Sequence, residues 1–234
     1  MPLLEVQNVT RRFGGVVALD DVSFEAEAGE VAGLIGPNGA GKTTAFNVIT
    51  CLYTPDMGDV RLDGRTLLGT RPHRVIARGV ARTFQNVELF RSMSVLDNVR
   101  IGSHARAGKR APGEVLDYVG LADVAHRAVA ALPFGTQKRV ELARALASGP
   151  KLLLLDEPAA GLNHEEVESL AGFLRRIQHD FELTLLLVEH HMGLVMGVAD
   201  RVHVLDFGKT IAAGTPAEVQ RDPAVIEAYL GAPE

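Results

Sequence analysis

The first part of the chain contains short runs of apolar and polar residues, separated from one another by Gly or Asp. Runs of this kind are typical of β-strands. The strands predicted here are 3–9 (LLEVQNV), 20–26 (DDVSFEA), 30–35 (EVAGLI) and 59–64 (DVRLDG). We expect these early strands to be antiparallel and to form an N-terminal antiparallel β subdomain.

The second half predicts further strands at 151–157, 183–189 and 201–208. Residues 152–155 and 183–188 are apolar apart from Thr184, which is typical of strands buried on both faces of a parallel sheet. Helices alternate with these strands. The segment 163–181 places apolar residues at helical spacing behind a possible N-cap at Asn163, and 137–149 is a second helix that ends at Gly149–Pro150.

Between these parts, residues 86–147 have helical stretches and no clear strand, with a probable exposed loop at 103–113. We interpret this region as a helical subdomain inserted into the sheet. The predicted fold is therefore α/β: one domain, 1–234, with a mixed sheet flanked by helices, an N-terminal antiparallel β subdomain and the inserted helices.

Composition limits the function classes. The chain has 234 residues, 47% of them hydrophobic, and carries 24 basic and 29 acidic residues, a net charge of −5. An acidic chain without a basic tract argues against broad nucleic-acid binding. Cys51 is the single cysteine, which fits a reducing compartment, and neither a signal peptide nor an apolar run of membrane-spanning length is evident. We expect a cytoplasmic location.

The clearest chemical motif is GPNGAGKTT, directly behind the apolar run 30–35. It satisfies G-x-x-x-x-G-K-[ST] in a strand–loop–helix context, so backbone N–H groups, a helix N-terminus and Lys42 would bind phosphates. The Thr43 hydroxyl would bind Mg²⁺. The predicted nucleotide-binding residues are Gly36, Pro37, Asn38, Gly39, Ala40, Gly41, Lys42, Thr43 and Thr44.

A second acidic motif completes this chemistry. Asp156 ends a buried strand, where its carboxylate would hold Mg²⁺ through water, and Glu157 follows and would take the proton of the attacking water. Two acidic residues at a strand end are common in themselves. They gain weight from the phosphate loop.

Five motifs in order resemble ATP-binding cassette ATPases: GPNGAGKTT, RTFQ, LPFGTQKRVELARAL, LLLLDEPAAGLN and LLVEHHM. The resemblance covers nearly the whole chain. It implies ATP hydrolysis with ATP and Mg²⁺, by two subunits packed head to tail. Each ATP would lie between the phosphate loop of one subunit and the signature loop of the other.

The resemblance also implies roles for isolated residues. Phe13 matches the aromatic residue that stacks on adenine, Gln85 the glutamine that touches Mg²⁺ and the water, and His190 the switch histidine at the γ-phosphate. Taken alone, they would be a core residue, a solvent-facing residue and a structural histidine. His191 stands where related ATPases often have Asp, and Cys51 where Gly is usual.

The signature loop implies partner contacts. Gly135 would offer its N–H to the partner's γ-phosphate, with Phe134 and Thr136 beside it, although both differ from the commonest form. Pro133 replaces the usual serine, so the helix N-terminus would carry the anion contact without a hydroxyl. The resemblance also implies that Asn163, where the family often has Asp, lies in the loop that crosses the dimer interface.

Longer segments (11–19, 82–99 and 195–231) resemble the ATPases of bacterial branched-chain or hydrophobic amino acid importers. That branch implies a paralogous ATPase, two membrane permeases fed by an external binding protein, and a position on the inner membrane face. Exposed apolar residues after Gln85, with Val87 and Phe90 favoured, would receive a permease helix. Urea or amide uptake, lipopolysaccharide export and a soluble role outside transport are the alternatives.

Overall fold

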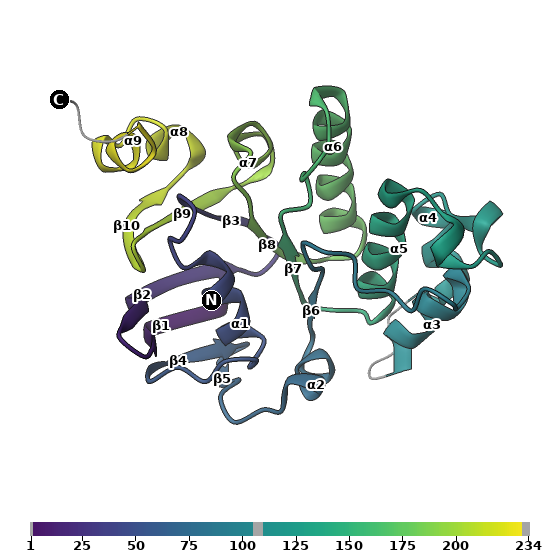
Figure 1. Cartoon of the computed structure of the whole chain (residues 1–234), viewed down its shortest axis with the longest axis horizontal. Coiled ribbons are helices and arrows are strands. Elements are labelled where there is room, and N and C mark those ends of the chain that lie inside the picture. The colour runs from purple at the N-terminus through teal and green to yellow at the C-terminus, as the bar shows by residue number, and fades with distance from the viewer. Residues whose placement is uncertain (1, 105–109, 231–234) are drawn as a thin grey trace.

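Two β-sheets form the centre of the protein (Figure 1). The computed structural model describes residues 2–104 and 110–230. A four-stranded sheet has the order β2-β1-β4-β5, and a six-stranded sheet the order β10-β9-β3-β8-β7-β6. The strands are β1 (Pro2–Phe13), β2 (Val16–Glu27), β3 (Val31–Ile35), β4 (Met57–Leu62), β5 (Arg65–Thr66), β6 (Val80–Arg82), β7 (Leu152–Asp156), β8 (Thr184–Val188), β9 (Arg201–Asp206) and β10 (Lys209–Gly214).

The four-stranded sheet is antiparallel throughout, as the sequence predicts for its strands. The prediction is wrong for 30–35, since β3 pairs parallel with both β8 and β9. All five residues of β3 are buried, so this strand needs cover on both faces, which a central position in the parallel sheet provides.

The six-stranded sheet is mixed because β10 runs antiparallel to β9 at one edge while the other pairs are parallel. Alternate residues of each strand face two different cores. On one face, Leu153 and Leu155 pack in the core that includes residues of the helices α6 (His164–Asp180) and α7 (Met192–Val198). On the other face, Leu152 and Leu154 join the core of the helix α1 (Lys42–Ile49) and the antiparallel sheet. The mixed α/β fold is confirmed.

Helices flank the six-stranded sheet, and α1 packs against the four-stranded sheet (Figure 1). Their bounds are α1 (Lys42–Ile49), α2 (Pro72–Val75), α3 (Val95–His104), α4 (Pro112–Tyr118), α5 (Phe134–Ala147), α6 (His164–Asp180), α7 (Met192–Val198), α8 (Pro216–Val219) and α9 (Pro223–Leu230), with 3₁₀ turns at Ile76–Arg78, Ala122–Val124 and Val129–Ala131. None of the helices in the described ranges combines the length and the apolar character that crossing a bilayer requires.

The described part of 86–147 contains α3, α4 and α5 and none of the named strands. Its limits as a subdomain stay a prediction. Of the predicted loop 103–113, residues 105–109 are not described, while 103–104 belong to α3 and 112–113 to α4, so the predicted loop is too long at both ends.

Helix α6 forms where its sequence predicts. Asn163 is the N-cap: its side chain accepts a hydrogen bond from the Glu166 N–H, and the Glu166 carboxylate accepts one from the Asn163 N–H. Val167, Leu174 and Ile177 are buried on one face. This capping box satisfies two N–H groups at the start of the helix and fixes the residue at which α6 begins.

Candidate ATP-hydrolysis site

The phosphate loop connects β3 to α1 and depends on glycine at two positions. Gly36 and Gly41 have φ values of 151° and 104°. A Cβ at Gly36 would collide with the Leu205 carbonyl oxygen, and one at Gly41 would lie 2.6 Å from the Ala18 carbonyl oxygen. The loop is therefore held tightly by the chain on either side, and it leads into α1, which begins at Lys42 as predicted.

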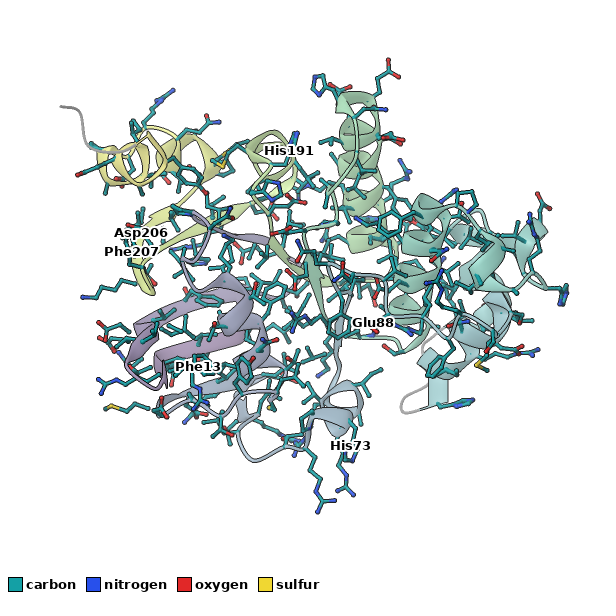
Figure 2. The ribbon with its side chains drawn as sticks, in the orientation of Figure 1. Phe13, His73, Glu88, His191, Asp206 and Phe207 are labelled. Carbon is teal, nitrogen blue, oxygen red and sulfur yellow. The ribbon has the colours of Figure 1, made fainter. Side chains whose placement is uncertain are left out.

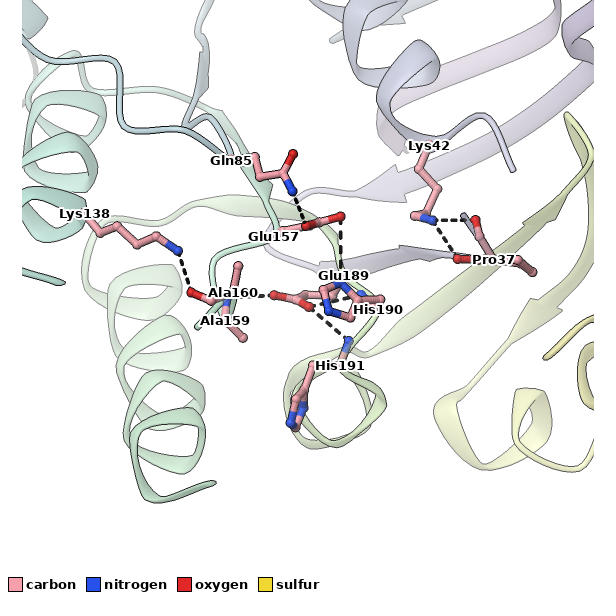
Figure 3. A network of polar contacts seen from close by, with 11 residues as sticks. Pro37, Lys42, Gln85, Lys138, Glu157, Ala159, Ala160, Glu189, His190 and His191 are labelled. Carbon is pink, nitrogen blue, oxygen red and sulfur yellow. Dashed lines mark hydrogen bonds and ion pairs between the residues drawn. The ribbon is translucent and has the colours of Figure 1, made fainter. Parts of the chain in front are cut away.

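The Lys42 side chain folds back over this loop (Figure 3). Its ammonium donates to the carbonyl oxygens of Gly36, at 2.6 Å, and Pro37, at 2.9 Å. Burial lowers the pKa of Lys42, while the nearby carboxylates of Glu157 and Asp156 act in the opposite direction. Among the other predicted residues of the loop, Ala40 is buried, Thr44 half-buried, and Asn38, Gly39 and Thr43 exposed.

Asp156 lies at the carboxyl end of β7 and is paired with an arginine. Arg82 Nη2 donates to Asp156 Oδ2 at 2.7 Å, and the two side chains are each 7% exposed. The other end of the guanidinium donates to Asn47 Oδ1 on α1, at 2.7 Å. Arg82 therefore connects the strand end that carries Asp156 to the helix that begins with Lys42.

Glu157 is where three predicted residues meet. Gln85 Nε2 donates to Glu157 Oε2 at 2.8 Å, and His190 Nδ1 lies 3.8 Å from Glu157 Oε1 (Figure 3). Glu157 has a φ of 47°, in the left-handed region, and its N–H donates to the Val188 carbonyl oxygen. Backbone strain of this kind is costly and is concentrated at functional positions.

Phe13 is at the end of β1 and is 39% exposed, which argues against the reading as a core residue. Its ring makes an edge-to-face contact with Tyr53, at 5.1 Å between centroids, and Arg11 lies 4.6 Å from the ring centre. Figure 2 labels Phe13 on the antiparallel sheet. Adenine stacking by this ring stays a prediction.

The signature residues lie at the N-terminus of α5. Pro133 is the N-cap, without a side-chain cap bond, and Phe134 is 56% exposed. Gly135 has open space around its Cα, and Thr136 is half-buried. Within the described residues no hydrogen bond or ion pair joins this helix end, or Asn163, to Lys42.

Besides Arg82, three charged residues at this site were missed by sequence reasoning. Glu141 is 2% exposed and accepts from the N–H groups of Phe84 and Glu88, so it anchors the segment around Gln85 on α5. Burial raises the pKa of the Glu141 carboxyl, against the effect of these hydrogen bonds. Lys138 and Glu189 hold the segment after Glu157. The sequence signal that could have identified them is a charged residue within an otherwise apolar helix face or directly after an apolar strand.

Comparison with known proteins agrees with this geometry. Residues 19–160 match the family model described as ABC transporter. The chain belongs to the ABC transporter family. Its activity is that of an ATP-binding, ATP-hydrolysing transporter subunit. Residues 209–234 also match a model described as branched-chain amino acid ATP-binding cassette transporter.

Individual relatives cover almost the whole chain. It is 40% identical to the high-affinity branched-chain amino acid transport ATP-binding protein BraF of Pseudomonas aeruginosa and 42% identical to LivG of Salmonella typhimurium, in each case over 98% of both chains. The crystal structure of the ADP conformation of an ATP-binding cassette of an ABC transporter superposes with a TM-score of 0.89 and 30% identity, over 99% of this chain and 100% of the other.

Proposed function

We propose that this chain is the ATP-hydrolysing subunit of an importer for branched-chain amino acids. The substrate class is supported by the match of 209–234 and by the full-length similarity to BraF and LivG. A sulfate/thiosulfate import ATP-binding protein of Chromobacterium violaceum is 38% identical, but this chain covers only 65% of it. The percentage of identical residues differs little between the amino acid transport proteins and the sulfate transport protein. The match of residues 209–234 therefore carries the proposed substrate class.

The observation that carries the catalytic roles is the Glu157 carboxylate between the Gln85 amide and the His190 ring. Glu157 takes a proton from the attacking water, and Gln85 and His190 hold the carboxylate in place and face the nucleotide. When ATP binds, the Lys42 ammonium donates to phosphate oxygens in place of its two carbonyl acceptors. The negative charge of the phosphate stabilises the buried ammonium more than a neutral carbonyl does. Phe13 stacks on the adenine.

The residues fit Mg²⁺ bound together with ATP. Among the described residues there is no cluster of three or more His, Cys, Asp or Glu side chains that could form a metal cage. Mg²⁺ commonly uses one or two protein carboxylates with phosphate oxygens and water, and Asp156, Thr43 and Gln85 would complete such a site. When bound, the ion neutralises charge that develops on the phosphates.

The N-terminus of α5 serves a neighbouring ATPase subunit in a head-to-tail dimer, either a second copy of this chain or a paralogue. Amide groups in the first turn of a helix lack acceptors within the helix, and Pro133 offers no capping oxygen. The Gly135 N–H is then available to the γ-phosphate bound by the partner, and Asn163 reaches across the same interface.

A groove of about 310 Å³ is the proposed docking site for a short permease helix. Its apolar lining includes Leu52, Val75, Ile76, Val80, Phe84 and Ile101. The groove borders Arg82, which holds Asp156, and Phe84, which precedes Gln85, so a docked helix acts directly on the catalytic residues. Phe90 is 52% exposed and Val87 is half-buried, and neither of them lines the groove. Phe90 is proposed as a second contact of the permease, on the segment after Gln85. The subunit would then lie on the inner membrane face, below permeases fed by an external binding protein.

The test is transport by a complete complex in vesicles, assembled from this chain, permeases and a binding protein, with the genes next to its own as the first place to look for them. Glu157→Gln should retain MgATP binding, trap an ATP-bound dimer and lose ATP turnover by about 10³-fold, because the general base is gone. Labelled leucine, isoleucine and valine are the substrates offered, with urea as the competing substrate. Glu227→Gln, at an exposed carboxylate on α9, is the control.

Leucine uptake that depends on Glu157 supports the proposal. Uptake of urea alone would overturn the substrate class, and wild-type turnover in Glu157→Gln would overturn the role of the glutamate. An ATPase that neither assembles with these permeases nor supports any uptake would favour the soluble alternative.

A further inference from the structure

Glu189 is a buried carboxylate to which the proposed function gives no part in ATP binding or hydrolysis. It follows β8 directly and has no exposed surface. One carboxylate oxygen accepts from the Ala159 N–H at 2.7 Å, and the other accepts from the N–H groups of His190, at 3.1 Å, and His191, at 3.0 Å (Figure 3). A buried carboxylate is costly without hydrogen bonds, so these three bonds keep it in one position.

The two oxygens hold two different catalytic segments. Ala159 lies two residues after Glu157, and its N–H is 30 residues from Glu189 in sequence. His190 is the adjacent residue, whose ring lies 3.8 Å from Glu157. A single rigid group therefore sets the backbone spacing between the segment that carries the general base and the segment that carries the switch histidine.

The same segment is held from its other side by α5. Lys138 Nζ donates to the Ala160 carbonyl oxygen at 3.0 Å, and burial lowers the pKa of this lysine, against the effect of Glu189, Glu141 and Glu157. Lys138 is on the helix whose N-terminus carries Gly135. One polar network thus connects the signature helix, the segment after Glu157, Glu189 and the switch histidine (Figure 3).

We propose that Glu189 is a positioning residue, which holds Glu157 and His190 in the geometry of hydrolysis through the backbone amides of Ala159, His190 and His191. This inference rests on the proposed roles of Glu157 and His190. Glutamine is close to isosteric with glutamate but has one acceptor oxygen, so in Glu189→Gln one of the two segments faces an amino group instead of an acceptor.

The measurement is kcat per occupied site in the assembled transporter, with sites counted by labelled ATP. Glu189→Gln should bind ATP at the wild-type stoichiometry and with unchanged affinity, but lower kcat by about 10²-fold, because misplacement by about 1 Å is enough for such a loss. A residue with a purely structural role would lower the number of ATP-binding sites and leave kcat per site unchanged.

Asp200→Asn is the matched control. Asp200 is also a carboxylate that accepts from a backbone N–H, that of Val31, and from Arg175, but it lies at the opposite end of β3 from the phosphate loop. Loss of one oxygen there should leave kcat per site within about twofold of wild type.

A second variant removes the donor and keeps Glu189. An amide-to-ester replacement at residue 159 removes the Ala159 N–H and leaves every side chain in place. It should reproduce the fall in kcat. Where the glutamine NH2 group faces Ala159, combining the ester with Glu189→Gln should add little, since both then remove the same interaction. It also tests the proposal if Glu189→Gln does not fold.

The outcomes separate this inference from the proposed function. The proposed function holds when wild type hydrolyses ATP and Glu157→Gln does not. If, in that case, either Glu189→Gln or the ester keeps the wild-type kcat per site, only the role of Glu189 is overturned. Wild-type turnover in Glu157→Gln would overturn the catalytic roles themselves.

Discussion

The N-termini of α1 and α5 are two helix ends predicted to contact the same kind of phosphate group, yet they differ in how complete they are. At α1 the loop is shaped by two glycines in the left-handed region, and Lys42 is already inside it, bound to two carbonyl oxygens. At α5 the cap is Pro133, without a side-chain bond, and Phe134 and Gly135 are exposed.

This difference indicates which contacts one chain provides alone. The α1 end has the loop and the Lys42 ammonium, with the carboxylates of Asp156 and Glu157 nearby, so the proposed phosphate site has its own groups in place before any partner arrives. The α5 end has only the N–H groups of the first helical turn and exposed residues around them. Half of the proposed ATP site is therefore complete in the monomer, and the other half acquires its function by assembly.

The largest expected effect is at the complete end. Lys42→Ala should weaken ATP binding to the isolated chain by about 10³-fold, because a buried charge-assisted contact to phosphate is lost. Equilibrium binding of a fluorescent ATP analogue measures this. Lys209→Ala, which removes a surface lysine paired with Asp20, is the control and should bind ATP normally. Unchanged binding in Lys42→Ala would show that the α1 end is not a phosphate site.

Gly135→Asp should act only after assembly. The added carboxylate would face the partner's γ-phosphate, so ATP turnover by the assembled transporter should fall by about 10²-fold, while ATP binding by the isolated chain stays normal. Pro133→Ser should stay within about twofold of wild type, since it adds a hydroxyl without removing an N–H. Normal turnover in Gly135→Asp would show that the N-terminus of α5 does not contact ATP in the assembled transporter.

Phe90→Asp tests assembly with the permeases. The Phe90 backbone is fixed by Asn98, whose side chain accepts from its N–H and donates to its carbonyl oxygen, so the exposed ring can change without moving the chain. Loss of an aromatic anchor should weaken association with the permeases by about 30-fold. Co-purification from detergent measures this at varied protein concentration.

The control for this variant is Phe207→Asp. Phe207 is 85% exposed and lies far from the segment labelled by Glu88 in Figure 2. Equal retention of the permeases by the two variants would exclude Phe90 from the interface.

The smallest effect is at the N-cap of α6. Asn163→Ala should lower the free energy of unfolding by about 1 kcal/mol, and Asn163→Asp should change it by only a few tenths, because aspartate also caps. Urea denaturation of the isolated chain gives both values. If either variant lowers turnover by the assembled transporter by more than its loss of unfolding free energy explains, a contact of Asn163 across the dimer interface is supported. If the loss of stability accounts for the loss of turnover, the role of Asn163 is limited to the cap.

Much of the site could be predicted because its motifs are local. GPNGAGKTT lies within nine consecutive residues, and Asp156 and Glu157 are adjacent. In such segments the spacing along the chain fixes which backbone N–H groups converge. The continuous apolar runs also identified β7 and β8 as buried parallel strands, and helical periodicity with a capping residue identified α6, since both signals depend on neighbouring residues. The parallel strands β3 and β6 were not identified in this way.

Contacts between distant segments were decided by the tertiary structure. The partners of β3, its place in the parallel sheet, and the pairing of Arg82 with Asp156 over 74 residues depend on strands that the sequence does not order relative to one another. Glu189 is the clearest case. In sequence it is one acidic residue after an apolar run, and only the packing of β7 beside β8 brings the Ala159 N–H to its carboxylate. Local conformation and the kinds of chemical groups present therefore follow from the sequence. Long-range packing buries the Glu189 carboxylate, and this burial is what makes its hydrogen bonds hold the segments of Ala159 and His190 together.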